Sequence, residues 1–184
     1  MYQIVEGSMY TVQRKGRAQI IRLCAMFTAL TVLFLYLSTI LPTAKISMFF
    51  VSSVFVGGIL IEGKPGSAFL VFIASALVSL LIIPNKLYLI PYVALFGHYG
   101  IGKYYLEKIK DKVLAYFAKL LYFNIGAALI YVLIAYVFMM PQIFTIPLWV
   151  LIIAAEVAFV IYDFVYSKIT VFYAVTIRPA LIKR

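Results

Sequence analysis

The chain has 184 residues, of which 66% are hydrophobic and 12% are charged, and its formal net charge is +10. A soluble domain of this length has charges on roughly a quarter of its residues, which keep its surface in water. The composition, with a mean hydropathy of +1.09, therefore excludes a soluble domain and predicts an integral membrane protein.

Apolar segments separated by proline, glycine or charged residues predict an all-α membrane protein built as a six-transmembrane-helix bundle. In chain order the segments run approximately over residues 23–41, 46–61, 67–83, 87–101, 120–140 and 146–166. A helix needs about 20 residues to cross the hydrocarbon, so the second and fourth segments must extend into their flanks. Helices are predicted because unpaired backbone groups are not tolerated in lipid, and the alternating pattern of a membrane barrel is absent.

The placement of basic residues predicts the orientation. If the N-terminus is inside, all of the 16 Lys and Arg residues except Lys45 and Lys86 lie on the inner side. Short loops rich in Lys and Arg stay in the cytoplasm, so both termini are predicted to be cytoplasmic, in a bacterial-type cell (inner) membrane. Anionic lipid of the inner leaflet accounts for most of the net charge. Because the basic residues are scattered over four inner segments, nucleic-acid binding is not predicted.

One membrane domain is predicted over residues 1–184. Residues 1–22 form a cytoplasmic or interfacial segment, residues 23–167 the bundle, and residues 168–184 a cytoplasmic tail. The inner loop at residues 103–119 has apolar positions at helical spacing, which predicts a short amphipathic helix on the membrane surface with a solvated charged face. Such a helix either docks a cytoplasmic partner or anchors the fifth span.

Ionisable residues at membrane depth are costly, which makes them candidate functional residues. Glu156 lies near the centre of the sixth segment, and Asp163 follows two turns later on nearly the same face. Asp163 is expected to pair with Arg22 or Lys119 near the interface, unless it has a functional role. For Glu156 two interpretations stay open: a functional carboxylate, or a protonated carboxyl hydrogen-bonded to a neighbouring helix.

The sequence shows no recognisable catalytic or metal-binding pattern, so an enzyme, a cofactor and a metal site are not predicted. The single histidine, His98, precedes a glycine-flanked helix exit, and the single cysteine, Cys24, cannot form an internal disulfide. Glu156 and Asp163 are roughly 10 Å apart along their helix. That separation is too long for two carboxylates to share one proton.

Three features of the chain indicate a family. A basic N-terminus leads into Arg22-Leu23-Cys24-Ala25-Met26-Phe27-Thr28-Ala29-Leu30, the inner turn Glu62-Gly63-Lys64-Pro65-Gly66 precedes an Ala/Ser-rich segment, and six spans fit into 184 residues with a charged stretch after the fourth. The spacing of Ala25 and Ala29 places two small residues on one stripe, which permits close helix packing in lipid. In these features the chain resembles the S components, the substrate-binding membrane subunits of energy-coupling factor (ECF) transporters for vitamin uptake.

This resemblance implies a bundle that binds a vitamin or similar small molecule near the extracellular side. It also implies that the first helix docks, through Ala25 and Ala29, onto a membrane coupling subunit driven by cytoplasmic ATPases. The outer halves of the fourth to sixth helices would line the pocket, where aromatic faces with a few polar anchors suit a flat ligand. The candidate ligand-binding residues are Lys45, Asn85, Tyr88, Tyr92, Gln142, Trp149 and Glu156. Trp149 and the tyrosines also fit an interfacial aromatic belt.

Two other functions are compatible with the sequence. One is a non-catalytic structural or assembly membrane protein, similar in build to small rod-shape-determining membrane subunits, which binds protein partners and no small ligand. The other is a lipid-handling membrane protein. A co-purifying small molecule would separate a solute-binding subunit from an assembly protein.

Overall fold

The computed structural model describes residues 17–41, 43–62, 65–137 and 147–177, and these residues are helical with no strand among them. The elements, in chain order, are α2 (Arg17–Ile40), α3 (Lys45–Glu62), α4 (Pro65–Ile82), the 3₁₀ turn η1 (Lys86–Leu89), the π turn η2 (Tyr92–Phe96), α5 (Gly97–Leu106), α6 (Lys112–Val132), the π turn η3 (Leu133–Val137), α7 (Leu148–Phe172) and the π turn η4 (Tyr173–Ile177). The predicted all-helical fold is confirmed.

Five helices in the described part of the chain are long and apolar enough to cross a membrane. Their spans are Ala18–Ile40, Lys45–Glu62, Pro65–Ile82, Lys112–Tyr136 and Trp149–Thr176. The predicted fourth segment lies in a helix that is continuous from residue 86 to residue 106, but its geometry changes from 3₁₀ to α to π before α5 begins. Pro91, which has no N–H to donate, lies directly before the π turn. With this irregular helix included, the fold is compatible with six spans.

The predicted surface helix at residues 103–119 is wrong. α5 continues to Leu106, a short turn follows, and α6 already begins at Lys112. Asp111 caps α6, because its carboxylate accepts hydrogen bonds from the backbone N–H of Val113 at 2.9 Å and of Leu114 at 3.4 Å. The charged stretch is therefore a tight connection between two helices, whose ends both extend into it.

The last helix continues past residue 167, the predicted end of the bundle. α7 and the π turn η4 continue as one helix to Ile177, so the first half of the predicted tail is helical. Lys168, counted as the start of the tail, lies within α7, and its ammonium group lies 5.4 Å from the centre of the Phe164 ring. The predicted segment at residues 1–22 falls largely outside the described residues, apart from the first turns of α2.

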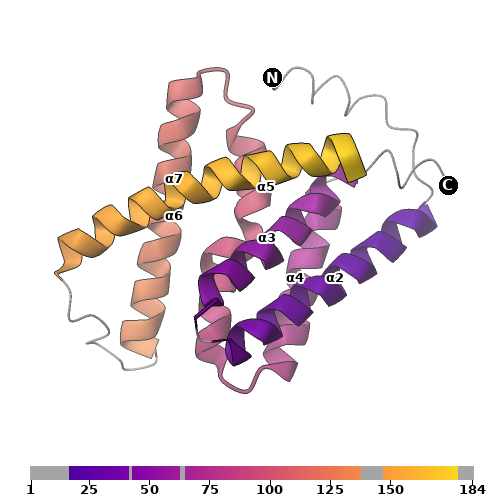
Figure 1. Ribbon diagram of the computed structural model, residues 1–184, viewed down its shortest axis with the longest axis horizontal. Helices are drawn as coiled ribbons and strands as arrows, with labels where there is room; N and C mark the ends of the chain where they lie inside the picture. Colours follow the sequence, from indigo (N-terminus) through magenta and orange to yellow (C-terminus); the bar gives the residue numbers. More distant parts are fainter. Residues whose placement is uncertain (1–16, 42, 63–64, 138–146, 178–184) are drawn as a thin grey trace.

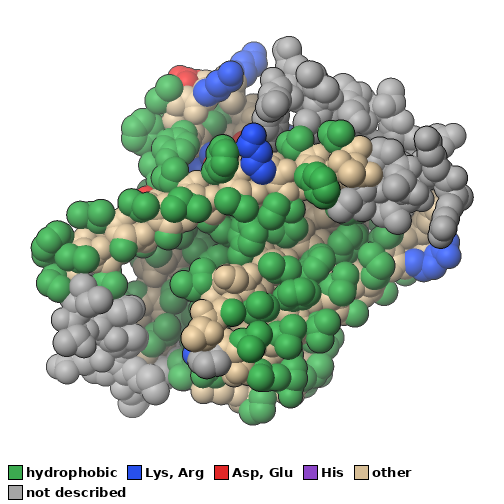
Figure 2. Space-filling model, viewed as in Figure 1, with side chains coloured by type: hydrophobic (Ala, Val, Ile, Leu, Met, Phe, Trp, Pro, Cys, Tyr) green, Lys and Arg blue, Asp and Glu red, His purple; other side chains and the backbone are tan. Residues whose placement is uncertain are grey.

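α3 is the central helix of the packing and contacts α2, α4, α5 and α7. Figure 1 shows α2 alongside α3 and α4, while α7 lies obliquely across α6 and α3. Several core serines donate to a carbonyl one turn earlier in their own helix; Ser52, for example, donates to the carbonyl of Phe49 at 2.7 Å. Apolar side chains cover much of the visible face in Figure 2, as expected of helices whose outer surface contacts lipid.

α3, α5 and α7 meet at two glycines and one tyrosine. Tyr166 on α7 is buried, and its hydroxyl points at Gly57 on α3 and Gly100 on α5, where a Cβ atom at either position would overlap it. A Cβ on Gly100 would also lie 3.4 Å from the Cα of Gly57. The absence of side chains at these positions lets the two backbones approach each other and admit the ring.

Candidate functional site

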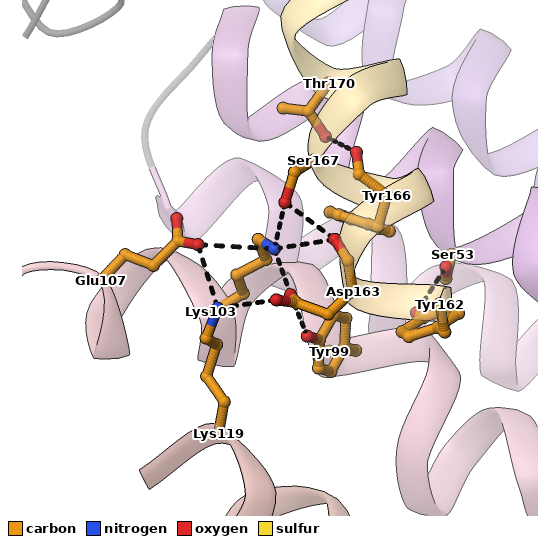
Figure 3. Close-up of polar contacts among 10 residues, drawn as sticks. All are labelled: Ser53, Tyr99, Lys103, Glu107, Lys119, Tyr162, Asp163, Tyr166, Ser167 and Thr170. Atoms are coloured by element: carbon orange, nitrogen blue, oxygen red, sulfur yellow. Dashed lines mark hydrogen bonds and ion pairs between the residues drawn. The ribbon is translucent and has the colours of Figure 1, made fainter. Parts of the chain in front are cut away.

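Four charged side chains come together where the end of α5 and the first turns of α6 meet the middle of α7. They are Lys103, Glu107, Lys119 and Asp163, which we call the charge cluster (Figure 3). α5 supplies Lys103, the turn after α5 supplies Glu107, α6 supplies Lys119 and α7 supplies Asp163. The four side chains are only 6–14% exposed. Two cations thus balance two anions inside the protein.

Asp163 is the centre of the charge cluster. Its carboxylate accepts hydrogen bonds from the Tyr99 hydroxyl at 2.6 Å, from the Lys119 ammonium at 2.7 Å and from the Lys103 ammonium. Lys103 also donates to the hydroxyl of Ser167 at 2.6 Å. Three donors to one carboxylate compensate for the water that it loses on burial, so the ion pair is fully hydrogen-bonded.

Glu107 closes the charge cluster from the turn after α5. Its Oε1 atom lies 3.4 Å from the ammonium of Lys103 and 3.5 Å from that of Lys119. Burial raises the pKa of Glu107 to about 7, against the opposing effect of the Lys119 charge. The predicted solvated face is therefore wrong for Glu107, because folding turns its carboxylate toward two lysines.

Of the two partners predicted for Asp163, Lys119 is confirmed. Arg22 is exposed on α2 and is not among the hydrogen-bond or ion-pair partners of Asp163 in the described residues. Three groups of the protein itself already donate to the carboxylate of Asp163. The charge cluster is therefore an ion-pair network that joins the end of α5 and the first turns of α6 to the middle of α7.

Aromatic side chains pack beside the charge cluster along the middle of α7. Tyr99, Phe159, Tyr162 and Tyr166 pack together there, and Phe159 stacks on Phe123 of α6 with ring centres 4.5 Å apart. The hydroxyl of Tyr162 lies 3.0 Å from that of Ser53 on α3, within hydrogen-bond distance. Because Phe159 is buried between the two carboxyls of α7, Glu156 is isolated from Asp163.

Glu156 contacts the neighbouring helix through Asn124. The amide nitrogen Nδ2 of Asn124 donates to Glu156 Oε1 at 2.5 Å and to the backbone carbonyl of Leu120 at 2.9 Å. Oε2 of Glu156 is buried and has no hydrogen-bond partner in the described part of the chain. This contact agrees with the predicted hydrogen bond to a neighbouring helix, and it leaves one carboxyl oxygen available.

The structure brings together some of the predicted ligand-binding residues and separates others. The ammonium of Lys45 lies 4.6 Å from the centre of the Tyr88 ring, and Asn85 caps the same 3₁₀ turn by accepting from the backbone N–H of Leu87 at 3.1 Å. Tyr92 is fully buried, and its hydroxyl lies 2.7 Å from that of Ser75, so it belongs to the core.

The remaining candidates lie elsewhere. Trp149, at the start of α7, is 66% exposed, and Gln142 lies outside the described residues. No hydrogen bond, ion pair or ring contact joins Trp149 or Glu156 to Lys45 or Tyr88 among the residues that the structure describes. Ala25 and Ala29, the predicted docking residues, are both exposed on α2.

A shallow hollow of about 200 Å³ lies between α2, α3 and α7. Phe27, Phe55, Gly58, Ile61 and Tyr173 contribute to its lining. Its walls are almost entirely apolar, and the hydroxyl of the lining residue Thr170 already donates to the carbonyl of Tyr166 at 2.7 Å. The hollow therefore offers no polar anchor with which to orient a solute.

No model of a known protein family, no curated protein and no solved structure matches this chain.

Proposed function

We propose that the chain is a membrane-embedded solute-binding subunit of an importer, similar to the S components of ECF-type transporters, with both termini in the cytoplasm. A vitamin or similar small molecule would bind near the extracellular side, and a membrane coupling subunit with cytoplasmic ATPases would drive its uptake. The observation that supports this proposal most is a helix face that carries two exposed alanines one turn apart, beside the larger Met26 and Leu33, and that no other helix of the described chain covers.

That face belongs to α2. Phe27, Thr31 and Leu35 are buried on the side of α2 that packs against α3 and α4. Ala25 and Ala29 are exposed on the other side, one helical turn apart. Two alanines leave a flat strip on which the backbone of a partner helix can pack closely.

The charge cluster has a role in this proposal. It ties the end of α5 and the first turns of α6 to the middle of α7, and the contact between Asn124 and Glu156 joins α6 to the first half of α7. A ligand near the extracellular ends would then bind between helices that these contacts hold together. Lys45 and Tyr88 from one side, and Glu156 from the other, would supply its polar contacts.

Replacing both Ala25 and Ala29 by leucine tests the docking face. We expect the double variant to fold, because both positions are exposed, and to lose a co-purifying ATPase-linked membrane partner, because the larger side chains hold the partner backbone away. Affinity purification from native membranes, followed by protein mass spectrometry, measures this loss. Ala128→Leu with Ala154→Leu is the matched control, since both alanines are exposed on other helices. Partner capture that survives in the α2 variant would refute the docking assignment.

An assembly protein without a small ligand is the second candidate. It is favoured by the internal contacts of Lys45, Asn85 and Tyr92, which need no ligand to be satisfied. Such a protein would keep its partner and bind no solute.

A further inference from the structure

The turn between α5 and α6 carries positive charge that the protein itself does not neutralise. Lys108, Lys110 and Lys112 are exposed. They form no ion pair within the described residues, where the ion pairs found involve Lys103 and Lys119. The carboxylates of the same turn are directed elsewhere: Glu107 points into the charge cluster, and Asp111 caps α6. In the folded protein the acidic groups of the turn therefore contact other parts of the chain, whereas its three lysines stay exposed.

Apolar side chains surround these three lysines. Val113, Leu114 and Phe117, in the first turns of α6, are 57–64% exposed, and Tyr105 at the end of α5 is 54% exposed. The ammonium of Lys108 lies 4.1 Å from the centre of the Tyr104 ring and 5.1 Å from that of Tyr105. Figure 2 shows Lys or Arg side chains above apolar ones at the upper end of α6, where Figure 1 places the turn.

We propose that this turn is a binding site for anionic phospholipid, in which Lys108, Lys110 and Lys112 contact the headgroup phosphate while Val113, Leu114 and Phe117 contact the acyl chains. One lipid molecule supplies both the anion and the hydrocarbon that this surface lacks. An acidic soluble protein would satisfy the lysines but would leave the apolar side chains in water. The turn joins two apolar helices of the bundle, so it lies at the depth of the headgroups. The proposal is independent of the solute-binding function.

Lipid retention tests the proposal. The purified chain is reconstituted into bilayers that contain equal amounts of phosphatidylglycerol and phosphatidylcholine, and the lipids that remain bound after gentle extraction are counted by native mass spectrometry. We expect phosphatidylglycerol to be retained in preference. Replacing all three lysines by glutamine should lower that preference by roughly 100-fold, since each lysine near an anionic surface is worth about 1 kcal/mol, or about 5-fold.

Two controls make the result specific. Replacing the three lysines by arginine should keep the preference, and Lys86→Gln, at the opposite end of the bundle, should leave it unchanged. Excess inorganic phosphate should not displace the lipid; displacement would show that the site takes free phosphate. The proposal would be overturned if the glutamine variant retained phosphatidylglycerol with the same preference as the unmodified chain. It would also be overturned if that variant kept its lipid preference but lost an acidic protein partner.

Discussion

Asp163→Asn is expected to lower the free energy of unfolding by about 3–5 kcal/mol, the usual cost of removing one partner from a buried ion pair. The substitution leaves Lys103 and Lys119 buried with Glu107 as their remaining counter-charge, at 3.4 Å and 3.5 Å. It also removes the charged acceptor of the Tyr99 hydroxyl. Unfolding in mild detergent, followed by circular dichroism or by tryptophan fluorescence of Trp149, measures the loss.

Two further variants separate the loss of the ion pair from a general effect of substitution in α7. Glu156→Gln keeps an acceptor for Asn124 and is expected to cost about 1 kcal/mol or less, as for a single hydrogen bond. Adding Lys119→Met to Asp163→Asn should cost less than Lys119→Met alone, because the lysine no longer has its carboxylate. Equal losses for Asp163→Asn and Glu156→Gln would contradict the central place of Asp163 in the charge cluster.

Gly57→Ala and Gly100→Ala are each expected to destabilise the protein by about 1–3 kcal/mol, the usual cost of overpacking a filled core. In an exposed helix the same change would stabilise by up to about 1 kcal/mol, so the sign itself is informative. The new methyl group would overlap the hydroxyl of Tyr166, whose ring is fixed by Tyr99, Tyr162 and Phe50. Thermal or denaturant unfolding of each variant provides the measurement.

Tyr166→Phe supplies the matching rescue. The Tyr166 hydroxyl is buried without a hydrogen-bond partner in the described part of the chain, so its removal alone should be neutral or slightly stabilising. It should recover part of the loss in Gly100→Ala, where the ring atom Cζ would still lie 3.2 Å from the new methyl group. Gly66→Ala is the control, since no atom lies within 4 Å of its added Cβ. A neutral Gly100→Ala variant would contradict the close packing of α3, α5 and α7.

The bounds of a helix were predictable where hydropathy and nearby proline or glycine residues determine them. Residues 46–61 and 67–83, predicted from hydropathy and from the breakers around them, correspond to α3 (Lys45–Glu62) and α4 (Pro65–Ile82) within two residues at each end. The length of an apolar run and the helix-ending effects of proline and glycine depend only on residues close together in the chain. Both can therefore be read from the sequence.

The start of α6 was not predictable in the same way. Lys112 and Lys119 lower the hydropathy of the first two turns, so the sequence predicts a surface helix there and places the start of the span at residue 120. Lys119 is nevertheless buried, because Asp163 on another helix offsets the cost of its charge. A prediction based on hydropathy alone contains no term for a partner that lies 44 residues away in the chain.

Only one ion pair of the charge cluster was predicted from the sequence. Charge and depth predicted the pair of Asp163 with Lys119, whereas Tyr99, Lys103 and Ser167 were missed. A signal was present, since Tyr99, Lys103 and Glu107 recur every four residues on one face of a helix. That spacing shows that the three side chains can act together, but only the packing of α7 against α5 shows which carboxylate they face.

The presence of a bound solute tests the proposed function most directly. The chain, purified from its native membrane, should release a vitamin-like, non-lipid small molecule that mass spectrometry identifies, and adding that compound should raise the midpoint of thermal unfolding. Glu156→Gln and Lys45→Gln should each reduce its occupancy, whereas Lys168→Gln, an exposed lysine in the last turns of α7, should not. A well-folded protein that releases no such molecule, and that no vitamin or vitamin precursor stabilises, would contradict a solute-binding subunit and favour an assembly protein.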